Sequence, residues 1–152
     1  MIQRIQSIFL LISLIAWGLL FFNPVMGFTD GAGKAWELNC NGISESAGGK
    51  LVLGAIPMLV LFVLTELLAV VAFFSYSRRA LQLRATVLGM MLQILSYGII
   101  LVYTLQGKAQ LDAKPQLLFW TIMPLIAAVS SYFAFRGIRR DILLLRAQDR
   151  LR

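Results

Sequence analysis

The sequence predicts an all-α protein, a single domain in which four transmembrane helices form a bundle. Of its 152 residues, 59% are hydrophobic and only 14% are charged, which is more apolar surface than a soluble domain of this length can bury. Charged residues divide the chain into four long apolar stretches, each reaching the roughly 20 residues that a helix needs to cross a bilayer. Backbone N–H and C=O groups must be hydrogen-bonded in lipid, which leaves helices or the strands of a closed barrel. The four stretches lack the alternation of apolar and polar residues that barrel strands show, so we expect helices.

The four predicted spans are residues 5–22, 51–75, 85–105 and 116–135. Residues 23–50 are polar and rich in glycine, so we expect an irregular outer loop there. Residues 107–115 are expected to form a short polar turn. The first span resembles a signal peptide in having Arg4 ahead of an apolar run, but the run exceeds the usual length of about 7 to 15 residues, which favours a retained helix.

The basic residues predict the orientation of these spans. All ten arginines flank one side of the predicted spans, and all four lysines, Lys34, Lys50, Lys108 and Lys114, flank the other. Cytoplasmic segments carry the excess of basic residues, so the arginine side is predicted to be cytoplasmic. Both termini are then predicted to lie in the cytoplasm.

Residues 136–152 follow the last span and hold six arginines interleaved with isoleucine and leucine. This pattern predicts a basic amphipathic helix, which either continues the fourth span into the cytoplasm or turns at Gly137 and lies on the membrane. These arginines are explained by their place at the end of a membrane span and by contact with lipid. They therefore do not require a nucleic-acid partner, and we expect none. The residues expected to contact anionic lipid headgroups are Arg78, Arg79, Arg84, Arg136, Arg139, Arg140, Arg146 and Arg150.

Glu66 is the one ionisable residue deep inside a predicted span, where an ionised carboxylate is costly unless it is paired, hydrated or protonated. An antiparallel hairpin of the second and third spans places Gln93 and Tyr97 at a similar depth. They are four residues apart, so they share a helix face, and either side chain is a candidate to hydrogen-bond the carboxyl group. The cluster is either a neutral acid that holds helices together or part of a proton or cation pathway.

Small residues in the fourth span predict close helix packing. Ala127, Ser130, Ser131 and Ala134 recur at three- and four-residue spacing, which lets another helix approach. Gly89 and Ser96 form a similar face beside Gln93. Pro57 and Pro124 fall within the second and fourth spans, where each permits a bend.

Several kinds of chemistry lack the residues they need. Histidine is absent, which removes the commonest general base near neutral pH and a frequent metal ligand. Cys40 is the single cysteine, so the chain alone cannot form a disulfide or an iron–sulfur cluster. We expect no cofactor and no metal, and the lone thiol is most simply a bystander.

Several stretches together resemble an uncharacterised family of small membrane proteins from Bacteroidetes, domain-of-unknown-function family 4293. They are the opening MIQRIQ, the basic turn RRALQLR at residues 78–84, RGIRRD at residues 136–141 and the ending RAQDRLR. The family pattern tends to continue after Asp141 with charged residues, whereas this chain has Ile142 and Leu143. The resemblance implies a bacterial inner-membrane protein with no established activity or cofactor.

Two functions of different classes fit these observations. The favoured one is a non-enzymatic accessory or scaffold subunit that packs against itself or against another membrane protein. The alternative is a small transporter or proton-coupled carrier that works through Glu66. A membrane enzyme has the least support, because the only conspicuous group of polar residues within the spans is Glu66, Gln93 and Tyr97.

Overall fold

The computed structural model describes residues 2–31 and 33–149, with side chains described for residues 6–31 and 33–144. It consists of four long α-helices, five short strands and two 3₁₀ helices. In chain order these are α1 (Ile2–Gly18), η1 (Leu19–Phe21), β1 (Met26–Thr29), β2 (Ala35–Asn39), β3 (Gly42–Glu45), β4 (Leu51–Gly54), α2 (Ile56–Phe74), α3 (Arg79–Leu111), β5 (Lys114–Leu117), η2 (Phe119–Ile122) and α4 (Met123–Asp149).

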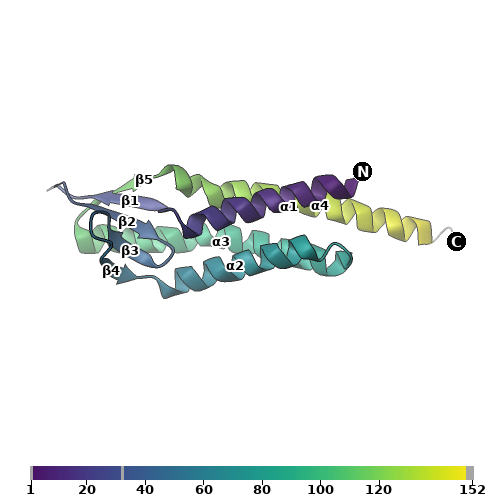
Figure 1. The fold of residues 1–152 in the computed structure, drawn as a ribbon, viewed down its shortest axis with the longest axis horizontal. Coiled ribbons are helices and arrows are strands. Elements are labelled where there is room, and N and C mark those ends of the chain that lie inside the picture. Colours follow the sequence, from purple (N-terminus) through teal and green to yellow (C-terminus); the bar gives the residue numbers. More distant parts are fainter. Residues whose placement is uncertain (1, 32, 150–152) are drawn as a thin grey trace.

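The four α-helices lie side by side along the long axis of the molecule, and the strands gather at one end of them (Figure 1). Helices α1 and α3 each pack against both α2 and α4, so the helices follow one another around the bundle in the order α1, α2, α3, α4. The start of α1 and the end of α4 lie at the end opposite the strands (Figure 1). We call these the sheet end and the arginine end, the latter formed by the start of α1, the α2–α3 turn and the second half of α4.

The predicted fold class, an all-α four-helix transmembrane bundle, is wrong. The five strands form one antiparallel sheet in the order β4-β3-β2-β1-β5, and four of them come from the region expected to be an irregular loop and from the start of the second predicted span. In β2, alternate residues are large and apolar. Trp36 and Leu38 on β2 are buried, whereas Glu37 between them is only partly buried, which is the period of a half-buried strand.

The sheet packs on the part of α3 that extends beyond the predicted end of its span. Trp36 lies opposite Phe28 in the pairing of β2 with β1, and both are buried in the same cluster. Gly107 of α3 faces this side of the sheet, since a Cβ there would lie 2.7 Å from Ile43 Cδ1 and 2.9 Å from Phe28 Cζ. The sheet therefore rests directly on the helix backbone.

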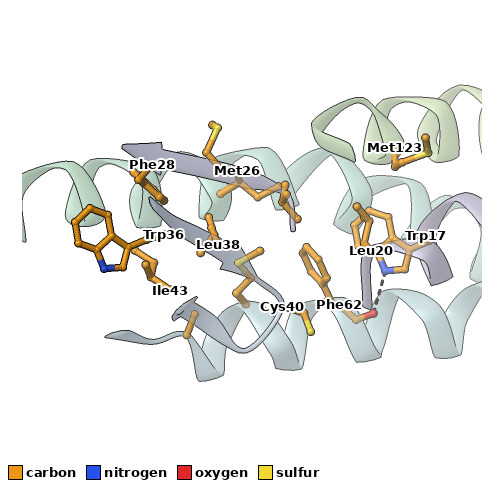
Figure 2. Packing of buried hydrophobic residues seen from close by; sticks show 14 of the residues in the cluster. Trp17, Leu20, Met26, Phe28, Trp36, Leu38, Cys40, Ile43, Phe62 and Met123 are labelled. Atoms are coloured by element: carbon orange, nitrogen blue, oxygen red, sulfur yellow. Dashed lines mark hydrogen bonds between the residues drawn. The ribbon is translucent and has the colours of Figure 1, made fainter. Parts of the chain in front are cut away.

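One apolar cluster joins the sheet to the bundle, and we call it the outer core (Figure 2). Trp17 and Phe62 connect it to the helices: their ring centroids are 5.0 Å apart, and Trp17 Nε1 donates a hydrogen bond of 3.0 Å to the carbonyl of Phe62. Its buried members are Ala16, Trp17, Leu20, Val25, Met26, Phe28, Trp36, Leu38, Cys40, Ile43, Ala55, Met58, Phe62, Ile100, Ala113, Met123 and Ala127. Sheet and bundle thus share one core.

Several helix ends differ from the prediction. Helix α3 continues to Leu111 and β5 begins at Lys114, so residues 107–115 are not a short polar turn. Pro57 and Pro124 each occupy the second position of an α-helix rather than its interior, and at this position the missing N–H group is not needed. Helix α4 passes through Gly137 without a break, so the tail continues the fourth helix through Asp149, the last residue described.

Three helical segments are long and apolar enough to cross a membrane by length and composition: Ile56–Phe74, Arg79–Leu111 and Phe119–Leu144. A fourth apolar helical segment, Gln6–Phe21, is shorter.

Candidate functional site

A layer of polar side chains crosses the middle of the bundle. Gln93 of α3 is only 1% exposed, and its Nε2 donates a hydrogen bond of 3.0 Å to Ser13 Oγ on α1. Ser13 Oγ lies 2.8 Å from Ser131 Oγ on α4, so these two hydroxyls are also hydrogen-bonded. Because α1 and α3 are not neighbours around the bundle, Gln93 reaches across its centre and ties three helices together.

The polar layer lies between two apolar regions. The outer core is on its sheet side, and a second cluster containing Leu10, Ala134 and Ile138 is on its arginine side. Within the layer the carbonyl oxygen Oε1 of Gln93 is buried without a hydrogen-bond partner. An unpaired buried acceptor is uncommon in a folded protein and costs free energy.

Glu66 of α2 lies apart from the polar layer, at the seam between α1 and α2. Its Oε1 is 3.5 Å from the position that a Cβ on Gly18 of α1 would occupy. The other carboxyl oxygen, Oε2, is buried without a hydrogen-bond partner. Part of the Glu66 side chain remains exposed on the outside of the bundle, which places its carboxyl group at the edge of the bundle rather than at its centre.

Tyr97 binds the beginning of the fourth helix. Its hydroxyl donates a hydrogen bond of 2.9 Å to the carbonyl of Thr121 and accepts one of 3.1 Å from the backbone N–H of Leu125. The first N–H groups of a helix have no partner within it, so Tyr97 caps α4. Thr121 in turn donates to the carbonyl of Val25 just before β1, which links α3, α4 and the sheet.

The predicted hydrogen bond between Glu66 and either Gln93 or Tyr97 is wrong. All three residues lie in the helical bundle, but Gln93 binds Ser13 and Tyr97 binds Thr121 and Leu125. Sequence reasoning missed Ser13, whose signal was a lone hydroxyl in the middle of the first apolar stretch. The small-residue stripe of α4, by contrast, is buried within the chain itself, and Ser131 forms a hydrogen bond with Ser13 of α1.

The arginine end carries a dense positive charge. Arg78, Arg84, Arg136, Arg139 and Arg140 are exposed. Arg79 Nη1 lies 3.6 Å from Asp141 Oδ2, an ion pair that joins the start of α3 to α4. Arg146 belongs to α4 but its side chain lies outside the described part of the chain, as does all of Arg150. At this end Gln6 packs against Gly137, and its Nε2 is buried without a partner.

Two further features limit the chemistry of the described residues. Among them, no three histidine, cysteine, aspartate or glutamate side chains gather where they could hold a metal ion. Cys40 is buried in the outer core, and this burial raises the pKa of its thiol above the usual value. Within the four predicted spans, Glu66 is the one acid, and the other polar side chains there are neutral hydrogen-bonding groups.

Comparison with known proteins places the chain in a family without assigning it an activity. No curated protein matches it significantly. One family model matches almost the whole chain, residues 2–151, and is described as a domain of unknown function, DUF4293. The chain therefore belongs to the DUF4293 family.

Proposed function

We propose that this protein is a multi-pass membrane protein that acts as a non-enzymatic accessory or scaffold subunit, binding another membrane protein through its sheet. The observation that carries the proposal is that the sheet has two open edges, β4 and β5. An open edge offers unpaired backbone groups to another chain. Edge β5 contains Lys114 and Pro115, which hinder such pairing, whereas β4 has neither a charge nor a proline.

We propose further that all four helices cross the membrane, with the arginine end in the cytoplasm of a bacterium and the sheet on the outer side. The partition of arginines and lysines between the two ends supports this orientation. Helix α1 is shorter than the others, but with η1 it runs from the arginine end to the sheet, alongside α4 (Figure 1). The exposed arginines are then placed to bind anionic lipid headgroups of the cytoplasmic leaflet.

The accessory role is tested by purifying the protein from its native membranes in a mild detergent. We expect an identified membrane protein to accompany it in a constant ratio, and Val52→Lys on β4 to remove that protein, because a lysine on an edge strand opposes pairing. The matched control is Gly31→Lys, which adds the same charge in the β1–β2 turn, where no atom lies within 4 Å of the new Cβ. Purification of this chain alone, from membranes that contain all its native neighbours, would reject the role.

A second candidate, a small proton-coupled carrier, rests on the unpaired Oε2 of Glu66. An acid within a membrane is a recurrent element of proton pathways. This candidate would require liposomes containing the protein to take up protons, and Glu66→Gln to abolish the uptake without lowering stability.

A further inference from the structure

Glu66 has a carboxyl group for which the described part of the chain supplies no counter-charge. None of the hydrogen bonds or ion pairs formed between described side chains involves Glu66, and its Oε2 is buried and unpaired. The sequence has no lysine, arginine or histidine in any of its four apolar stretches. Acidic side chains within a membrane are otherwise found paired or lining an aqueous cavity.

The residues around Glu66 lie on the outer surface of the bundle, where a group from another molecule can approach them. Gly18 lies across the seam and has no side chain to cover the carboxyl group. Glu66 Oε1 lies 3.5 Å from the position that a Cβ on Gly18 would occupy. The flanking residues on α2, Val63 and Leu67, are 41% and 54% exposed, and Ile15 on α1 is 54% exposed. An apolar surface therefore surrounds a carboxyl group at the edge of the bundle, and we call the surface formed by Ile15, Gly18, Val63, Glu66 and Leu67 the Glu66 seam.

We propose that the Glu66 seam binds a transmembrane helix of a different protein, one that carries a lysine or arginine at the depth of Glu66. This inference rests on the accessory role proposed above and specifies the chemistry of the partner. A basic side chain would donate its hydrogen bonds to the carboxylate and neutralise it, while the apolar flanks pack against the same helix. A second copy of this chain does not fit, because its membrane stretches hold no basic residue.

A designed peptide tests the seam directly. The full-length protein is placed in phosphatidylcholine vesicles with a labelled polyleucine transmembrane peptide that has either one central lysine or leucine at that position, and association is measured by energy transfer. We expect the lysine peptide to bind about tenfold more tightly than the leucine peptide. The preference should disappear in Glu66→Gln and in Glu66→Met, which remove the charge at similar side-chain length.

The matched control is Glu45→Gln on β3, which changes the net charge by the same amount at the sheet and should leave the preference intact. Thermal unfolding of each variant checks that it is folded. Equal binding of the two peptides to the wild-type protein would overturn the proposal, and so would a preference that survives both Glu66 variants.

Purification of the Glu66 variants from native membranes distinguishes this inference from the accessory role. If a partner accompanies the wild-type protein, it should be lost with Glu66→Gln, and its sequence should contain a basic residue within a membrane span. A partner retained by the Glu66 variants would overturn the inference while leaving the accessory role standing. If no partner is found, the accessory role fails. The peptide measurement still shows whether the Glu66 seam binds a helix that carries a basic residue.

Discussion

Two glycines of α3 lie in different surroundings, and the difference shows what each position requires. At Gly107 a Cβ would lie under 3 Å from Ile43 and Phe28, whereas at Gly98 nothing lies within 4 Å. Gly107 is therefore needed for the contact between helix and sheet, and Gly98 is not needed for any contact within the described part of the chain.

We expect Gly107→Ala to lower the free energy of unfolding by about 1–3 kcal/mol, because the added methyl group pushes the sheet away from α3. Gly98→Ala is the control in the same helix and should cost nothing, since alanine favours helix more than glycine does. Unfolding of both variants in mixed detergent measures the difference. Equal stability of the two variants would mean that the sheet does not rest on α3 as closely as described.

The sequence predicted the polar residues of the bundle better than it predicted their partners. Matching residues across the α2–α3 hairpin fixes how far along the bundle axis a residue lies, but not the direction in which it points around its helix. Gln93 points to the bundle centre and Ser13, and Tyr97 points to the start of α4, while Glu66 faces the α1–α2 seam. Depth and helix periodicity alone do not determine which of the other three helices each side chain meets.

At the scale of elements, α4 depends on its small residues to pack closely within the bundle. Ala134 is fully buried and Ser131 is hydrogen-bonded to Ser13 of α1. We expect Ala134→Leu to destabilise the protein by about 1–3 kcal/mol, because its larger side chain separates the packed helices.

Val129→Leu is the control for this substitution, since Val129 is 46% exposed on the same helix and a surface change of this kind usually shifts stability by less than about 0.5 kcal/mol. The comparison uses the same detergent unfolding. If both leucine variants were equally stable, the small residues of α4 would not be what sets its distance from the neighbouring helices.

The strands could not be predicted from the sequence patterns, for physical reasons. Each of β1, β3, β4 and β5 has only four residues, too few for an alternating pattern to stand out among many glycines. Strand β4, Leu51–Gly54, is apolar and adjoins α2, so by composition it belongs to the same membrane stretch. Strand β5 contains Pro115, which argues against a strand except at an edge, where it lies.

At the scale of the whole molecule, the proposed orientation predicts which end a membrane-impermeant maleimide reaches. Gly31→Cys places a thiol in the β1–β2 turn, and Tyr76→Cys places one in the α2–α3 turn, where Tyr76 is 71% exposed. In intact spheroplasts we expect the Gly31→Cys variant to be labelled and the Tyr76→Cys variant to be labelled only after the membrane is permeabilised.

The native thiol provides the background for this measurement. Burial of Cys40 raises its pKa, so at neutral pH less of it is the reactive thiolate, and the unmodified chain should label slowly. If the Tyr76→Cys variant were labelled in intact spheroplasts and the Gly31→Cys variant were not, the orientation would be the opposite of the one proposed.

The pairing of β1 with β5 also constrains the order in which the protein is assembled. These strands are neighbours in the sheet, yet α2 and α3 lie between them in the chain. Contacts of such long sequence separation form late in folding. If the helices cross a membrane as proposed, the sheet can be completed only after the third helix has been inserted in the correct direction. A chain whose third helix failed to cross would then leave β1 as an open edge that quality-control proteases and chaperones can recognise.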